Sequence, residues 1–254
     1  MTSTASRARN SKPLEIGARV GFAVNGLLHL LIGGIALGVA FGGGGEADQG
    51  GALGQLASNP VGQVVLWAIV VGLAALGLFS ILTAVVDTGE TKDRIKNAGK
   101  GVAYLAVGGT ALTFALGGSS DSSQTTESLS AKLLETPGGV ILLVVLGLGV
   151  IAIGVYFVVK GAKKKFLDDI TGRGRATVAT GTIGYIAKGI AIGVVGILFI
   201  VAAFTADATK ATGLDGALKS LAALPLGVLV LAAVAIGLIA FGIYSFLRAR
   251  SARL

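Results

Sequence analysis

The chain contains no cysteine, a single histidine and four prolines in 254 residues. The missing cysteines exclude disulfide bonds, thiolate metal sites and cysteine nucleophiles. With His29 alone, the sequence also lacks a histidine pair for zinc or haem and has no His-Glu-x-x-His motif. Because no serine has a recognisable partner base either, the sequence predicts a protein that is not an enzyme and that holds no cofactor or metal.

Charged residues are also scarce, at 13% of the chain against about 25% in a typical soluble domain. What the chain has instead is 53% hydrophobic residues and 41 glycines. A bilayer core of about 30 Å needs roughly 20 apolar residues of helix. Six stretches meet this requirement and contain no Asp or Glu, which predicts an all-α integral membrane fold with six transmembrane helices. They are residues 20–41, 61–86, 101–118, 138–159, 182–204 and 226–247.

The charges are distributed unevenly between the two ends of these stretches. All but three of the 21 Lys and Arg lie in the two termini, in the segments after the second and fourth stretches or, in the case of Lys188, near the start of the fifth stretch; the exceptions are Lys132, Lys210 and Lys219. By the positive-inside rule both termini are cytoplasmic, and we expect a multi-pass plasma-membrane protein. The excess of basic residues then favours contact with anionic lipid headgroups, most of all at 163–165, over binding of nucleic acid or a protein partner at that cluster.

Three copies of one pattern are visible in the second, fourth and sixth stretches. Each follows the skeleton Pro-x-Gly-x9-Gly-x4-Gly-x-(Phe/Tyr), with a leucine four residues before the proline. Such a period indicates a repeat architecture. The signature residues are Pro60 and Gly62, Pro137 and Gly139, and Pro225 and Gly227.

The repeat predicts three two-helix hairpins that all enter the membrane from the same side, arranged with pseudo-threefold symmetry. We place a disordered basic tail at 1–15 and the hairpins at 16–87, 88–165 and 166–250. Glycines seven residues apart share one helix face, and small residues allow close packing of helices in lipid. The predicted packing glycines are Gly26, Gly33, Gly101, Gly108, Gly189 and Gly196. Short helical segments at 51–59, 128–136 and 215–224 are expected to cap the bundle, or alternatively to form a lid.

With the repeats laid out, the chain resembles an actinobacterial membrane family known as domain of unknown function 1206. The resemblance rests on the entry 18–21, on Gly26 and Gly33, and on Gly-Ala-Leu at 51–53 before Pro-Val-Gly at 60–62. It covers residues 16–250, with Asp-Gly-Ala-Leu at 215–218 in the third copy and a weaker form at 127–139 in the second. The resemblance implies three copies of the unit and a membrane location, and it brings no known activity or functional residues.

Polar side chains inside a membrane span are the usual indication of function. Equivalent positions of the three copies hold Asn25, Lys100 and Lys188, and one turn deeper His29 and Tyr104. Around a pseudo-threefold axis these five residues would form a ring that binds an anionic ligand or a lipid headgroup. The alternative is that the two lysines extend along the interface to water, and that His29 makes a helix-to-helix hydrogen bond.

The predicted function is that of a non-catalytic structural or accessory protein that binds membrane-protein partners or lipid. The alternative is a passive pore or small-anion carrier along the pseudo-threefold axis. Coupled transport is disfavoured because the spans contain no carboxylate.

Overall fold

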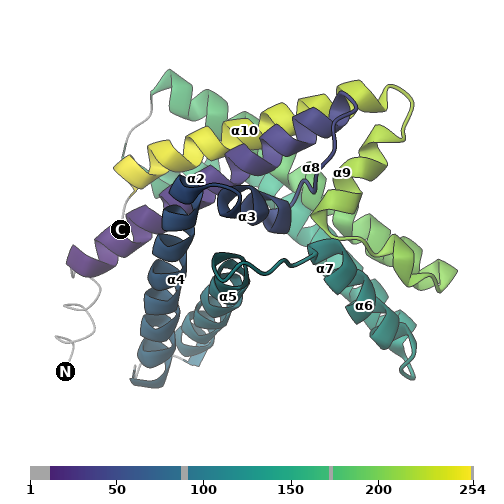
Figure 1. Ribbon diagram of the computed structural model, residues 1–254, viewed down its shortest axis with the longest axis horizontal. Coiled ribbons are helices and arrows are strands. Elements are labelled where there is room, and N and C mark those ends of the chain that lie inside the picture. The colour runs from purple at the N-terminus through teal and green to yellow at the C-terminus, as the bar shows by residue number, and fades with distance from the viewer. Residues whose placement is uncertain (1–11, 87–90, 172–173, 253–254) are drawn as a thin grey trace. The chain divides into compact units, whose positions relative to one another are not determined.

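The computed structural model describes residues 12–86, 91–171 and 174–252. Across these ranges the regular elements are helices, with one isolated antiparallel bridge between Ile170 and Ala252 (Figure 1). The all-α class predicted from the sequence is therefore confirmed. The long helices are α2 (Lys12–Ala40), α4 (Pro60–Val86), α5 (Thr91–Ala115), α7 (Gly139–Ala162), α8 (Arg175–Thr205) and α10 (Gly227–Ser251). The short helices are α3 (Gln49–Ala57), α6 (Ser122–Leu134), η1 (Lys165–Asp169), η2 (Ala208–Lys210) and α9 (Leu214–Ala222).

Five helices of the described residues are long and apolar enough to cross a membrane: α2 from Arg19 on, α4, α7, α8 and α10. The sixth predicted span, 101–118, lies largely within α5. The first turn of α5 contains the charged Arg94, and the apolar part of the helix is interrupted by Thr110 and Thr113. The lower hydropathy of α5 therefore leaves its crossing of the membrane a prediction.

The chain forms two compact units, each described here by itself. One unit contains residues up to 24 together with 53–120, and in it α4 lies along α5. The other contains residues 25–52 and those from 121 to 253. In this second unit α8 packs between α7 and α10, and α10 lies alongside α2 (Figure 1).

Pairs of glycines make close helix contacts in both units. In the first unit a Cβ at Gly101 would lie 3.0 Å from the carbonyl oxygen of Gly77. In the second unit a Cβ at Gly189 would lie 2.5 Å from that of Gly154, and one at Gly26 would lie 2.9 Å from that of Gly242. No larger residue fits at these distances, so the helix backbones touch directly.

Each of these contacts joins the second helix of one copy to the first helix of another. The pairs are α4 with α5, α7 with α8, and α10 with α2, so the third copy contacts the first. The other three predicted packing glycines lie two turns further along the same crossings. Gly33 faces Ala235, Gly108 faces Leu73, and Gly196 faces Gly147.

The Pro-x-Gly signature marks a tight turn from each short helix into the next long helix. Pro60 is the first residue of α4, and α7 and α10 begin two residues after the other two prolines. A Cβ at Gly62 or Gly139 would overlap the carbonyl oxygen of the repeated leucine, Leu56 or Leu133. Gly227 lies as close to Leu221 and Ala222. The signature glycine is required because the preceding helix passes directly over it.

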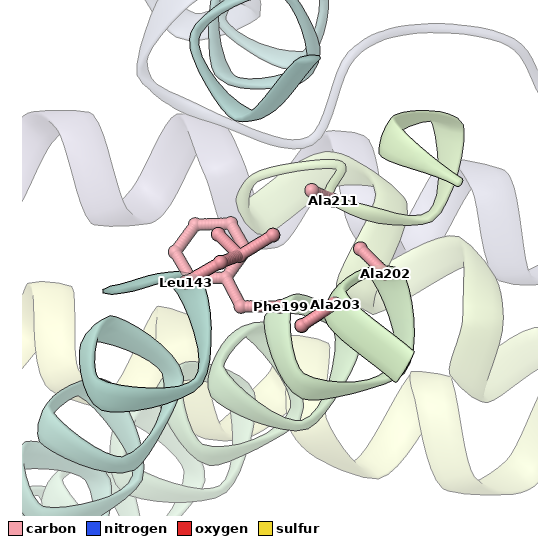
Figure 2. Close-up of a cluster of buried hydrophobic side chains, with 5 residues drawn as sticks. All are labelled: Leu143, Phe199, Ala202, Ala203 and Ala211. Atoms are coloured by element: carbon pink, nitrogen blue, oxygen red, sulfur yellow. The ribbon is translucent and has the colours of Figure 1, made fainter. Parts of the chain in front are cut away.

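Apolar side chains close this turn in the second unit. Leu143 in the first turns of α7 packs with Phe199, Ala202 and Ala203 of α8 and with Ala211, which follows η2 (Figure 2). All five are buried, and Leu133 and Leu134 of α6 pack against the group. The end of α6 is therefore held against the start of α7 and the end of α8.

Replacing Gly139 by Ala should destabilise the protein by about 1–3 kcal/mol, because the new Cβ meets a backbone carbonyl that cannot move freely. The measurement is thermal unfolding in detergent. The matched control is Gly149→Ala on the same helix, where a Cβ meets nothing within 4 Å. Equal stability of the two variants would contradict this explanation of the signature.

Candidate functional site

Three of the predicted site residues, Asn25, His29 and Lys188, meet on one face of α10 in the second unit. The Asn25 side-chain nitrogen donates a hydrogen bond to the Ser245 hydroxyl at 3.1 Å. The His29 ring lies 4.7 Å from the ring of Phe241, and the Lys188 ammonium lies 4.3 Å from the centre of the same ring. Phe241 is therefore the common contact of this group.

Lys188 is stabilised by aromatic faces. Besides Phe241, its ammonium lies 5.4 Å from the ring centre of Phe157. Within the described part of the chain, no Asp or Glu forms an ion pair with it. Cation–π contacts are worth about 0.5–2 kcal/mol each and leave the positive charge uncompensated. Lys188 thus lies half-buried between α7, α8 and α10, next to aromatic rings and without a carboxylate partner in the described ranges.

His29 is oriented by its own helix. Its Nδ1 lies 2.8 Å from the backbone oxygen of Asn25, one turn earlier. A carbonyl oxygen can only accept, so Nδ1 carries the hydrogen and the other ring nitrogen, Nε2, is the acceptor when the ring is neutral. The hydrogen bond of His29 is therefore made inside α2 and not between helices as expected, and its contact with α10 is ring packing on Phe241.

An aromatic cluster surrounds this site toward the end of the unit that carries the C-terminus. It consists of Phe166, Ile170, Tyr185, Phe241 and Tyr244, all buried. Phe166 enters from η1 and fills the space above Gly181, where a Cβ would overlap its ring. This cluster could not be predicted from the sequence, because isolated aromatic residues in apolar helices have no distinguishing spacing.

Two ion pairs of Asp169 lie next to the cluster. Asp169 accepts from Lys160 at 2.8 Å and also lies 3.5 Å from Arg248. Thr171 donates its backbone N–H at 2.8 Å and its hydroxyl at 3.1 Å to the backbone oxygen of Ser251, beside the Ile170–Ala252 bridge. The linker after α7 is thereby attached to the last turn of α10.

Lys100 and Tyr104, the other two predicted ring residues, belong to the first unit. Both lie on α5, where Lys100 is exposed and Tyr104 is half-buried. The second unit therefore brings together three of the five residues, and the complete ring stays a prediction.

The predicted lipid-contacting lysines form an exposed group. Lys163, Lys164 and Lys165 follow the end of α7 and are all exposed, and the backbone at Lys164 is left-handed with φ 54°. Of the other basic residues on this predicted side, Arg7, Arg9, Arg173 and Arg253 lie outside the described residues.

Carboxylates gather at the opposite end of the second unit, around Asp48 and Asp215, which are 2% and 5% exposed. The sequence analysis did not single them out; the acidic residue in the first turn of α9 was the available signal. Within the described ranges, no group of three or more His, Asp or Glu is placed to hold a metal ion.

The helices and their repeated glycine contacts define a membrane-type helical protein built from three copies of one unit. A family model described as "Domain of Unknown Function (DUF1206)" matches three segments, residues 20–87, 95–164 and 183–252. The chain belongs to this family, which confirms the predicted resemblance.

A relative of similar length was also found. The chain is 31% identical over 243 residues to "Uncharacterized protein YxxB" of Bacillus subtilis (strain 168), which covers 91% of this chain and 88% of the relative. No solved structure matches the chain. The actinobacterial source expected from the resemblance stays a prediction.

Proposed function

We propose that the protein is a non-catalytic structural or accessory component of the plasma membrane, with six spans and both termini in the cytoplasm. The observation that carries this proposal is the surface of α4 and α7. Large apolar side chains are exposed along the whole of α7, among them Ile141 at 69%, Val145 at 59% and Val155 at 56%. Apolar faces of this extent are covered by lipid or by another membrane protein.

The helix contacts support α5 as the sixth span. Its glycines Gly101 and Gly108 pack on α4 at the same positions where Gly189 and Gly196 of α8 pack on α7. A helix that repeats the contacts of a membrane-crossing helix is expected to lie at the same depth. With six spans the two termini fall on the same side, in agreement with the distribution of Lys and Arg.

The same contacts support a pseudo-threefold arrangement of the copies. Three equivalent glycine crossings link the first copy to the second, the second to the third and the third to the first. A chain of equivalent contacts that returns to its starting copy is what a threefold axis requires.

Distance measurements between spin labels should test the threefold axis. Phe41, Leu116 and Phe204 occupy equivalent positions at the ends of α2, α5 and α8, and all three are at least 70% exposed. Because the chain has no cysteine, pairs of introduced cysteines can be labelled uniquely. We expect three equal distances in nanodiscs. The pair 41/204 lies within one unit and serves as the reference; clearly unequal distances for the other two pairs would refute the axis.

The exposed basic residues after α7 favour lipid as the partner. The three exposed lysines 163–165 have no ion-pair partner in the described ranges, and they follow directly on a span. Each basic residue close to an anionic membrane surface contributes about 1 kcal/mol. Anionic headgroups are therefore proposed to bind at this end.

Changing Lys163, Lys164 and Lys165 together to Gln should lower the amount of anionic phospholipid retained after purification in mild detergent, measured by native mass spectrometry. The control changes Lys132 and Lys210, which are exposed at the predicted outer side, to Gln. We expect retention to fall only in the triple variant. A wild-type protein that purifies with neither lipid nor a protein partner would count against the accessory role.

One observation favours a passive small-anion pathway as the second candidate function. The Lys188 ammonium is half-buried and is held by aromatic rings in place of a carboxylate. A positive charge in this setting attracts an anion that is small enough to reach it. Lys100 occupies the equivalent position in the second copy.

Anion flux into liposomes should separate the two functions. If the pathway exists, changing Lys100 and Lys188 together to Ala should reduce the flux to the level of protein-free liposomes, whereas Lys132→Ala should leave it unchanged. A wild-type protein without flux would eliminate the pathway and leave the accessory role.

A further inference from the structure

Three segments that are far apart in the sequence meet at the end of the second unit that carries α6 and α9. The first is the segment 46–52, which includes the start of α3. The other two are the first turn of α6 and the first turn of α9. The backbone N–H of Ala47 donates to Asp215 Oδ1 at 2.8 Å in a buried hydrogen bond. A Cβ at Gly213, just before α9, would lie 3.4 Å from the Thr126 hydroxyl of α6.

Four carboxyl groups lie at this junction, and Lys219 is the cation that faces them among the described residues. We call Glu46, Asp48, Asp121 and Asp215 the carboxylate cluster. Asp215 pairs with Lys219 at 2.7 Å, and Asp121 accepts from the backbone N–H of Gln124 at 2.8 Å. The cluster therefore carries excess negative charge when all four groups are ionised.

Asp48 is the most deeply buried member of the cluster. Its Oδ1 accepts from the backbone N–H of Gly51 at 2.9 Å. Its Oδ2 is buried and has no hydrogen-bond partner in the described part of the chain, while the whole residue is 2% exposed. A buried carboxylate oxygen without a partner is costly, and the cost disappears when the group binds a proton.

Burial, with a smaller contribution from the charge of Asp215, raises the pKa of Asp48 above its ordinary value, while hydrogen bonding with Gly51, Ser122 and Gly50 acts in the opposite direction. Burial, followed by the charges of Asp121, Asp48 and Asp215, raises the pKa of Glu46 as well, with Lys219 acting in the opposite direction. A carboxyl whose pKa is raised by folding binds its proton more tightly in the folded state. Its stabilising effect is therefore complete at low pH and is lost as the pH rises through the raised pKa.

We propose that the carboxylate cluster is a proton-dependent clasp, in which protonation of Asp48 holds the segment 46–52 against α9 and ionisation of Asp48 loosens it. The hydrogen bond from Ala47 to Asp215 is the contact that closes the clasp. When Asp48 is ionised, it repels Asp215 and Glu46 across a buried space. The hydrogen bond from Ala47 to Asp215 then weakens, and the segment 46–52 loosens locally.

The test is amide hydrogen exchange of the segment 46–52, measured by mass spectrometry on the full chain in nanodiscs and corrected for the intrinsic pH dependence of exchange. We expect the protection of the segment to fall by about fivefold or more as the pH rises from ~3.5, below the ordinary pKa of an aspartate, to ~8, which corresponds to a modest change in local stability. This measurement uses the wild-type protein alone, so it does not depend on whether a variant folds. Protection that stays constant over this range would overturn the proposal.

Asp48→Asn provides the matched variant, because an amide keeps the acceptor for Gly51 and cannot ionise. Its segment 46–52 should stay protected across the whole pH range. The control is Asp207→Asn, since Asp207 is exposed, lies outside the cluster and is held by Thr209, whose hydrogen bonds lower its pKa. Asp207→Asn should behave as the wild type; an Asp48→Asn variant that keeps the wild-type pH dependence would also overturn the proposal.

Discussion

Direct backbone contact between helices is the constraint on which the rest of the structure depends. Within a bilayer, burying apolar side chains yields little driving force, so close approach through glycine has to supply much of the packing. The pairs Gly77–Gly101, Gly154–Gly189 and Gly26–Gly242 provide that approach at three equivalent places. The scarcity of bulky residues on these faces and the abundance of them on the exposed faces of α4 and α7 follow from the same requirement.

Much of this arrangement could be predicted from the sequence, because the glycines and prolines that determine it recur at equivalent positions of the three copies. The spacing of Gly26 and Gly33 marks a helix face, and the recurrence of Pro-x-Gly marks the start of each second helix. The partner of each face could not be predicted, since sequence order suggests pairing within a copy. The glycine contacts instead run between successive copies, and only in the third copy does Gly237 also pack against Ala187 of its own first helix.

The site was predictable in part for a related reason. Asn25, His29 and Lys188 stand out as polar residues in apolar helices, so their types alone attract attention. Phe241 contacts both His29 and Lys188. It is one of ten phenylalanines and has no distinctive neighbour in the sequence, so it could not be singled out. The same holds for the bond between Ala47 and Asp215, which joins residues 168 positions apart through a buried backbone group.

The order of the glycine contacts also bears on how such a chain arises. Each copy presents one glycine face on its first helix and a different, complementary face on its second helix, and each face meets a different copy. This is a head-to-tail interface, of the kind that builds closed rings when the rotation between subunits allows it. A two-helix chain with both faces contains everything needed to assemble with copies of itself, and fusing three such chains into one polypeptide would fix the number of copies while leaving each contact unchanged.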